Sequence, residues 1–450
     1  MDNVTHSLVG AALAQGTIQL YYWKHRSKQT ALATPEQAQA VSETPDGEEA
    51  TENTVQTTSE VSTPSLPAMP FFLASIFANN FPDLDLFVTL FTEPRLGYIL
   101  HHRGHTHTFL FVILQWFAIM AGFWGYARWK GWNWQKDHWK WLGGLVALGG
   151  FVHIGMDSWN VYGVHPLWPF DNRWYYGDFV FIIEPLIWLS LIPWLLAVVQ
   201  RRWTRNLLIF FYGLSFVALS VAYLGIWWYP LTILVLAFSY GFTVRFRLPL
   251  AMKALVSIST VVLVLMVLLI GSRWSRATLV ETFERGGKEK VLDLAIMSYP
   301  SNPFCVGFIS TSLHKKTQDY IARRGTFSLW PKVMDCPVFE RDATAPVKQL
   351  PIAASPKVGG FIGKMKTFRK PRAELLKLEN EHCRVRAILQ FVRSPYWKIT
   401  KHAIFFGDLR FDRRKGLDFS DFQLRLKPKN CPTMLPPWIP PTRTSGLLKK

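Results

Sequence analysis

The stretch TFLFVILQWFAIMAGFWGYA, residues 108–127, carries no charged side chain. A helix needs about 20 apolar residues to cross roughly 30 Å of hydrocarbon, so this stretch predicts a membrane-spanning helix. A buried helix of a soluble protein could imitate one such run, but not a whole series of them. The further runs are 139–157, 179–200, 252–271 and residues 206–244, which lack Asp, Glu, Lys and Arg and are divided into two spans by Trp227-Trp228-Tyr229-Pro230.

Two less apolar segments precede residue 108. Residues 4–22 predict a first helix, which we expect to stay attached because the opening Met1-Asp2-Asn3 lacks the basic start of a cleavable signal peptide. Residues 68–90 predict a short second span. Between them, residues 29–66 are rich in Thr, Ser, Glu, Gln, Ala and Pro, which predicts a disordered acidic linker. The sequence therefore predicts a mainly α-helical, polytopic transmembrane bundle of about eight membrane helices.

The tail of the chain differs in charge and in cysteine content. Residues 272–450 hold 34 Lys and Arg against 15 Asp and Glu, whereas residues 1–271 hold 16 of each, so the tail accounts for the whole net charge of +19. Disulfides are expected if the tail is exported, with three possible pairings; four free thiols in a cytosolic tail are the alternative. The four cysteines of the chain, all in this tail, are Cys305, Cys336, Cys383 and Cys431.

Short apolar segments between Gly and Pro turns, at 305–312, 326–330 and 403–411, predict a small β-rich extramembrane domain. We expect its basic surface to rest on anionic lipid headgroups, at about 1 kcal/mol per nearby Lys or Arg. Nucleic acid is not expected as a partner, because no recognition motif accompanies the charge. The predicted parts are a first membrane helix (1–28), the linker (29–66), a transmembrane domain (67–271) and the β-rich domain (272–450).

The basic residues of the loops predict an orientation. Loops on the face of the His-rich stretch 101–107 contribute only Arg95, Arg103 and Arg173, whereas loops on the opposite face contribute thirteen basic residues. The more basic face of a membrane protein is usually cytoplasmic. The His-rich stretch, both termini and the tail are therefore expected outside.

The stretch His101-His102-Arg103-Gly104-His105-Thr106-His107 is the main candidate site. Imidazoles beside a bilayer are costly unless they serve a metal, a proton path or a substrate. Histidine and aspartate side chains are together the usual ligands of Zn²⁺, Mn²⁺ or Fe²⁺. Several imidazoles and several carboxylates exceed the four ligands of one tetrahedral site, which suggests two or more ions. Paired metals commonly hydrolyse phosphoesters. The candidate ligands on this one predicted face are His6, Asp83, Asp85, His102, His107, His153 and Asp157.

Each candidate also has a plain structural interpretation. His6 could be a polar helix-start residue, and Pro82-Asp83-Leu84-Asp85 could cap a helix. The i,i+4 spacing of His153 and Asp157 also fits an intrahelical hydrogen bond. Arg103 could form a salt bridge with Asp83 or Asp85. Glu184 could only brace Arg173 or a helix end. Whether Asp178 and Glu184 join the site is left open by the sequence.

At these residues the chain resembles the YdjM-like family of bacterial inner-membrane metal-dependent hydrolases. The family segment matched by Phe181-Ile182-Ile183-Glu184-Pro185 would carry Asp at position 184, and the linker at 29–66 resembles an insertion. The other matching pieces are Thr5-His6, Pro82-Asp83-Leu84-Asp85, His102-Arg103-Gly104-His105-Thr106-His107, His153-x-x-x-Asp157, Trp168-Pro169-Phe170, Tyr299-Pro300-x-Asn302-Pro303 and Asp408-Leu409-Arg410-Phe411.

The resemblance implies a multi-pass protein of the bacterial inner membrane with a periplasmic metal site. The residue order is more distantly similar to the zinc-dependent phospholipase C and P1-nuclease group, which implies phosphoester hydrolysis by analogy. That group also uses a terminal amine as a ligand, which the sequence does not place at Met1, and a second His-x-x-x-Glu, which is missing near the site.

We therefore predict a membrane-embedded hydrolase that cleaves a phosphoester of a lipid or another envelope substrate with metal-activated water. The seven candidate ligands would hold one or more Zn²⁺-like ions, Arg103 would neutralise the phosphate, and Asp85 would act as general base. The alternatives are a non-enzymatic membrane scaffold and a metal or proton transporter. A transporter should carry ionisable residues deep within several spans, and the middles of 108–127, 207–224 and 254–271 hold none.

Overall fold

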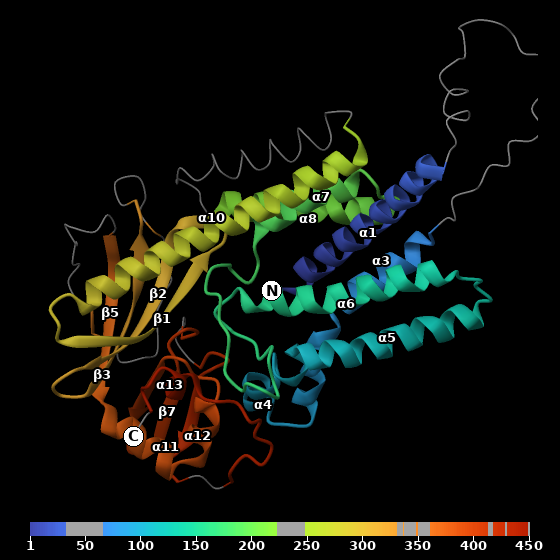
Figure 1. Ribbon diagram of the computed structural model, residues 1–450. Coiled ribbons are helices and arrows are strands. Elements are labelled where there is room, and N and C mark those ends of the chain that lie inside the picture. Colours follow the sequence, from blue (N-terminus) through green and yellow to red (C-terminus); the bar gives the residue numbers. More distant parts are fainter. Residues whose placement is uncertain are drawn as a thin grey trace, which may run out of the picture.

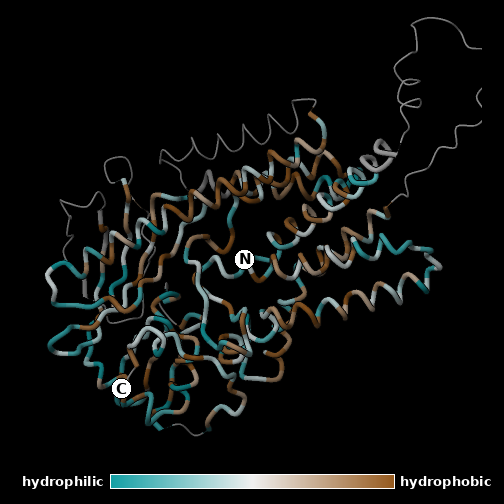
Figure 2. The backbone as a smooth tube through the Cα atoms, viewed as in Figure 1, coloured by the Kyte–Doolittle hydropathy of each residue, from teal (hydrophilic) through white to brown (hydrophobic). Residues whose placement is uncertain are grey.

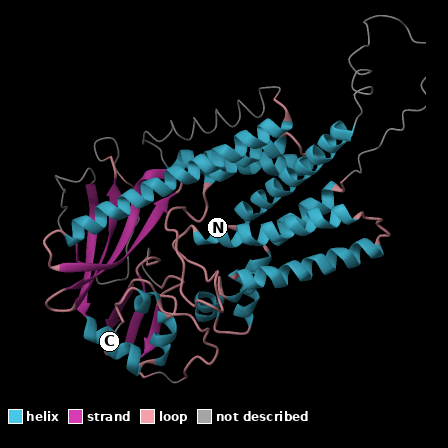
Figure 3. Ribbon diagram, in the orientation of Figure 1, coloured by secondary structure: helices cyan, strands magenta, loops and turns pink. Residues whose placement is uncertain are grey.

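The structure is a computed structural model that contains a helical part and a β-containing part (Figure 1, Figure 3). Most of the predicted linker at 29–66, and the predicted span beyond Trp228, lie outside the described residues. The described residues are 1–32, 66–222, 248–330, 336, 348–349, 361–412, 417–427 and 430–448.

The helical part is formed by long helices joined through two short 3₁₀ segments that carry the His-rich and Asp-rich motifs. Its elements are α1 (Asn3–Leu32), α3 (Ala68–Ala78), η1 (Phe81–Leu90), α4 (Pro94–His101), η2 (His105–His107), α5 (Phe109–Trp129), α6 (Lys136–Ser158), α7 (Pro185–Leu196), α8 (Arg202–Ala222) and α10 (Leu250–Glu284).

The prediction of about eight membrane helices is wrong. Among the described residues, two helices, α5 and α10, are long and apolar enough to cross a membrane, and hydrophobic residues line most of α10 in Figure 2. The apolar helices α3 and α7 have 11 and 12 residues, hence about 17 to 18 Å at 1.5 Å per residue, well short of the hydrocarbon thickness. Every side chain of α7 from Pro185 to Leu195 is buried. Hydrophobicity along these segments therefore serves helix packing as well as lipid contact.

Close packing joins the first helices. A Cβ on Gly10 of α1 would lie 3.0 Å from the Cα of Ile76 in α3, so only glycine allows the two backbones to approach so closely. Tyr21 of α1 and Phe71 of α3 are fully buried in the same cluster as Leu142 of α6. This packing brings the start of α1 and the end of α3 to the same end of α6.

The β-rich tail is confirmed, and the fold is mainly helical with a β domain. The predicted strands at 305–312 and 403–411 fall in β2 and β7, and 326–330 overlaps the end of β3. The first sheet has the order β1-β2-β3-β5-β4 and the second the order β6-β7-β8, with antiparallel pairs throughout. The strands are β1 (Glu289–Tyr299), β2 (Asn302–His314), β3 (Asp319–Ser328), β4 (Lys348–Gln349), β5 (Phe361–Pro371), β6 (Pro395–Ile399), β7 (Ala403–Asp408) and β8 (Phe422–Arg425).

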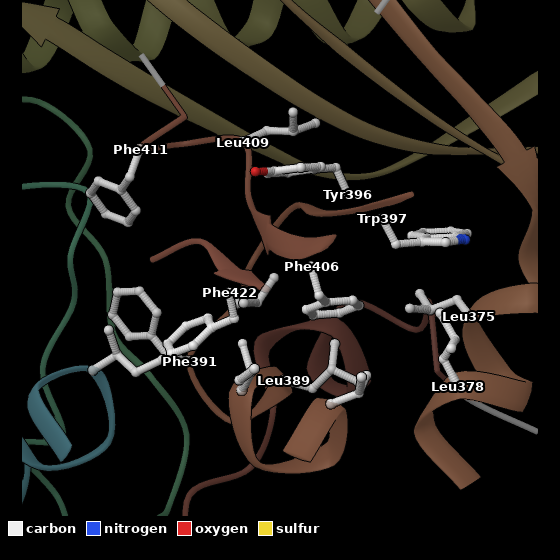
Figure 4. Packing of buried hydrophobic residues seen from close by; sticks show 14 of the residues in the cluster. Leu375, Leu378, Leu389, Phe391, Tyr396, Trp397, Phe406, Leu409, Phe411 and Phe422 are labelled. Atoms are coloured by element: carbon white, nitrogen blue, oxygen red, sulfur yellow. The ribbon is translucent and has the colours of Figure 1, made fainter. Parts of the chain in front are cut away.

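Helices and disulfides complete the tail. Helix α10 continues past residue 271 to Glu284 and lies along the first sheet (Figure 1). Trp397 and Phe406 of the second sheet pack on the helices α11 (Arg372–Glu381) and α12 (Cys383–Leu389), as Figure 4 shows, and α13 (Pro441–Thr444) follows. The cysteines pair as Cys305–Cys336 and Cys383–Cys431, which selects one of the three possible pairings.

A buried ion network joins the two parts. The Arg393 guanidinium lies 2.8 Å from Asp178 Oδ2 in the helical part and donates to Asp293 Oδ2 of β1 at 2.5 Å. The side chains of Arg393 and Asp178 are 4% and 5% exposed, so loss of Arg393 would leave a buried carboxylate short of a partner. Asp178, which the sequence left as a possible site residue, is thus a joint between the two parts.

We predict that Arg393→Leu destabilises the protein by roughly 3 kcal/mol, because it removes the nearest cation from Asp178 and Asp293 and leaves them only Arg276, at 3.7 Å from each. Thermal unfolding in detergent measures the loss. Arg369→Leu is the control: it removes a surface ion pair with Asp319 from a side chain that is 51% exposed, and should change stability by about 1 kcal/mol or less. Equal melting temperatures for the two variants would contradict the assigned role of the network.

Candidate metal centre

The site is built around Asp157, which is fully buried in the last turn of α6. Arg103 Nε lies 3.0 Å from Asp157 Oδ2, and His107 Nε2 lies 3.2 Å from the same oxygen. His6 Nε2 approaches the other oxygen, Oδ1, at 3.2 Å. A buried carboxylate at the negative end of a helix needs such compensation, so side chains from two distant parts of the chain converge on it.

Four donor atoms surround a common centre. Asp83, His107, His153 and Asp157 each offer one ligand atom, and these atoms all lie within 4.8 Å of one another. The His107 Nε2 atom lies 3.1 Å from His153 Nε2, 3.4 Å from Asp83 Oδ1 and 3.2 Å from Asp157 Oδ2. His153 Nε2 lies 3.7 Å from Asp83 Oδ1 and 3.8 Å from Asp157 Oδ2. Bonds of about 2.0 Å in a tetrahedron give ligand separations of about 3.3 Å, so the group could hold a metal ion.

Hydrogen bonds at the far ring nitrogens orient both imidazoles. His153 Nδ1 lies 2.6 Å from the backbone oxygen of Asn79, and His107 Nδ1 lies 3.3 Å from Asp85 Oδ2. Such partners fix the tautomer and direct Nε2 toward a metal. The alternative of an intrahelical hydrogen bond is not what forms, because His153 Nε2 lies 3.8 Å from Asp157 Oδ2.

A second group lies beside the first. Asp83, Asp85 and His102 also offer ligand atoms within 4.8 Å of one another, and Asp83 belongs to both groups. His102 Nδ1 lies 2.9 Å from Asp85 Oδ1, while Asp85 Oδ2 accepts from the backbone N of Arg103 and from Thr106 Oγ1, both at 2.8 Å. Asp85 therefore orients the His-rich turn in addition to offering an oxygen.

The amino end of α1 also reaches the site. The His6 ring stacks on His153 with 3.9 Å between centroids, and the amino nitrogen of Met1 contacts Asp157 Oδ1. Asp2 accepts from the backbone N of Val4 and of Thr5, which sets the start of the helix. Sequence reasoning did not place Met1 here; its position before His6 was the available signal, but contact with α6 depends on tertiary packing.

Arg103 lies in the site with a left-handed backbone, at φ 61°. Its guanidinium contacts Asp157, donates to Asn160 Oδ1 at 2.9 Å and lies over the Tyr162 ring, with 5.1 Å from Cζ to the centroid. The expected alternative, a salt bridge with Asp83 or Asp85, is thus replaced by one with Asp157. Asn79, Asn160 and Thr106 are supporting residues that the sequence did not single out.

The remaining candidates lie elsewhere. His105 packs edge-on against Trp168, and His101 lines a separate surface pocket near Arg384. The Glu184 carboxylate accepts from the backbone N of Ser301, at 3.0 Å, in the turn between β1 and β2. Glu184 therefore braces the tail, as Asp178 does, and its expected partner Arg173 pairs with Asp171 instead.

The cluster favours positive charge at His107 but disfavours it at His6 and His153, because burial lowers the pKa of both of those imidazoles. Burial disfavours the charged form of Asp83, yet hydrogen bonding to His107 and the charge of His153 lower the pKa of Asp83 to about 2. Burial likewise disfavours a charged His107, but hydrogen bonds to Asp157, Asp83 and Asp85 raise the pKa of His107 well above its usual value. A site that stabilises an added proton in this way also suits a cation.

These features define a chain with a buried His and Asp group that could bind a metal and, among the described residues, two helices long and apolar enough to cross a membrane. Residues 53–229 match the family described as "YdjM inner membrane protein", so the family resemblance is confirmed over that part of the chain. The "Uncharacterized protein YfhP" of Bacillus subtilis (strain 168) is 28% identical over 127 residues, which are 28% of this chain and 36% of that protein. The chain thus matches about a third of the length of that relative. No solved structure matches the chain significantly.

The buried carboxyl of Glu184 should make the stability of the protein depend on pH. Burial raises the pKa of Glu184 from 4.5 to about 7 although its hydrogen bonds favour the charged form. A carboxyl whose folded pKa is raised contributes stability below its unfolded pKa and loses it as the pH rises through 7. We expect the unfolding free energy to fall by roughly 3 kcal/mol between pH 4.5 and 8 from this group.

Thermal melting across that pH range tests the prediction. Glu184→Gln should remove its part of the fall and leave the part due to Asp421, whose pKa burial also raises to about 7. Glu281→Gln, at a side chain that is 64% exposed, should leave the profile unchanged. A wild-type slope that persists in Glu184→Gln would exclude Glu184 as its source.

Proposed function

We propose that this protein is a metal-dependent hydrolase that cleaves a phosphoester with metal-activated water. The observation that supports it is the group of four inward-facing donors, five of whose six separations lie between 3.1 and 3.8 Å. Two imidazoles and two carboxylates suit Zn²⁺, which we propose as the ion. Because catalytic zinc keeps an open position, water would take a further coordination position beside these four donors. When bound, such an ion would supply Lewis acidity for water and for phosphate.

The residues of the site are proposed to have separate roles in holding and orienting the metal ligands. Asp83, His107, His153 and Asp157 would hold the ion, with His6 packed beside them. Asp85, with His102 and Asp83, would offer a second cation position while it orients His107. The general-base role of Asp85 stays a prediction, and its engagement with three donors favours the orienting role.

Arg103 is proposed to bind the phosphate. Its planar guanidinium adjoins Asp157 and is 3% exposed, so a substrate oxygen would meet it in a site shielded from water. Two parallel N–H groups of arginine match phosphate oxygens better than a lysine ammonium does. Neutralising the phosphate lets a nucleophile approach an otherwise anionic group.

We propose that the protein is multi-pass in the inner membrane, with the site and the tail on the periplasmic side. Two disulfides in the tail support an oxidising compartment. Phe87, Leu90 and Phe91 are 62%, 74% and 82% exposed on or beside η1, the element that carries Asp83 and Asp85. Such apolar exposure supports a site at the lipid boundary, with a lipid or another envelope phosphoester as substrate and anionic headgroups beneath the basic tail.

His107→Ala and His153→Ala should each lower bound zinc at least tenfold, because each removes one of four ligands. Elemental analysis of the purified protein measures zinc, and hydrolysis of bis(p-nitrophenyl) phosphate and of phosphatidic acid measures activity. His138→Ala is the control, since His138 lies on α6 with His153 but packs against Tyr21. Unchanged zinc in both site variants would refute the ligand assignment. Zinc binding without any hydrolysis would favour the scaffold or transporter alternatives.

Arg103→Lys should retain zinc but lower kcat/KM for a phosphoester by roughly 10- to 100-fold, because lysine keeps the charge and loses the planar fork. Parallel measurement of zinc content separates this effect from damage to the site. Wild-type kinetics in the lysine variant would show that Arg103 serves only to pair with Asp157.

A further inference from the structure

A second feature of the helical part is an apolar groove between α3 and α5. It has a volume of about 300 Å³, within the range of small-ligand sites. One wall comes from α3 and the start of η1, and the other from the middle of α5. The residues that matter here are Leu73, Phe77, Phe81, Ile119, Gly122 and Phe123.

One wall of the groove adjoins, along the chain, residues of the metal centre. Phe77 and Phe81 lie on either side of Asn79, whose backbone oxygen bonds to His153 Nδ1 at 2.6 Å. Phe81 also lies two residues before Asp83, one of the four metal-ligand candidates. Its ring stacks on Phe111 in the first turn of α5, with 6.1 Å between centroids. Phe81 therefore connects the groove to the segment that carries Asp83.

The surface around the groove is suited to lipid. Helix α5 is one of the two described helices that could cross a membrane, and 17% of its most apolar window is buried. On the facing wall, Leu73 and Phe77 are 56% and 47% exposed. Because every lining residue except Tyr126 is apolar, a hydrocarbon chain would lose little by leaving the bilayer for this groove.

We propose that the groove between α3 and α5 holds one acyl chain of the substrate, and that the substrate is therefore a membrane lipid whose phosphoester lies at the metal centre. This inference rests on the proposed function. The chain would enter sideways from the bilayer along α5, and the headgroup would pass Phe81 to reach Asp83. The groove thereby selects long-chain lipids over soluble phosphoesters with the same headgroup.

Two glycines of α5 allow a matched test. A Cβ at Gly122 or at Gly125 would meet nothing within 4 Å, so a larger side chain fits at either position. Gly122 lines the groove. Gly122→Phe should fill it, whereas Gly125→Phe adds the same bulk to the same helix without entering it. Melting temperature and zinc content establish that both variants fold.

The kinetic measurement compares dioleoyl and dihexanoyl phosphatidic acid in detergent micelles. Gly122→Phe should lower kcat/KM for the dioleoyl lipid at least tenfold and leave the dihexanoyl lipid within twofold, while Gly125→Phe should change neither. An equal loss for both lipids, or no loss for the dioleoyl lipid, would overturn the proposal.

A binding measurement separates the groove from the catalysis. Phosphatidic acid with a photoreactive diazirine in its acyl chain, in nanodiscs with the full-length protein, should label α3 and α5 at the groove. Gly122→Phe should reduce that labelling at least fivefold relative to Gly125→Phe, and unchanged labelling would overturn the proposal. If labelling behaves as expected while the wild type hydrolyses neither lipid, the proposed function fails and the substrate role of the groove fails with it. The groove would then remain a lipid-binding site.

Discussion

The helical part depends on the burial of one carboxylate, that of Asp157. The carboxylate lies at the negative end of α6 and is not exposed to water. The free-energy cost of burying its charge would be prohibitive without cationic and imidazole partners. Those partners come from the start of α1 and from the His-rich turn, which is why segments that are distant in sequence are drawn to one point. The same convergence that stabilises Asp157 forms the metal-ligand geometry.

The tail supports this site as well as covering it. Trp438 Nε1 donates to the backbone oxygen of Leu100 at 2.8 Å, just before the His-rich turn, and its ring stacks on His165 with 3.8 Å between centroids. The fully buried Arg410 donates to the backbone oxygen of Val161 at 2.6 Å, a few residues beyond Asp157. Chain segments on both sides of the metal centre are therefore held by the β-rich domain, and its loss should loosen the donors rather than merely expose them.

Hydropathy was the weakest guide to this fold. Apolar runs predicted a span wherever they exceeded the needed length, but α7 uses its apolar residues to contact other helices on all sides. Residues 81–90 form a 3₁₀ helix instead of continuing a span, because Pro82 begins a new segment and the inward-facing Asp83 and Asp85 belong to the site. Periodicity and length cannot distinguish a partner helix from lipid as the apolar surroundings.

The residue types and local spacings of the sequence were enough to identify the seven candidate ligands, the β-rich tail and the family resemblance. They are local properties: His153 and Asp157 share a helix face wherever that helix lies. Tertiary structure alone decided that Asp178 and Glu184 join the tail, that the Met1 nitrogen reaches Asp157, and that His102 and His107 turn inward while His105 turns away. The reason is physical: these outcomes depend on distances between segments that are far apart in the chain, which packing and the pairing of buried charge determine.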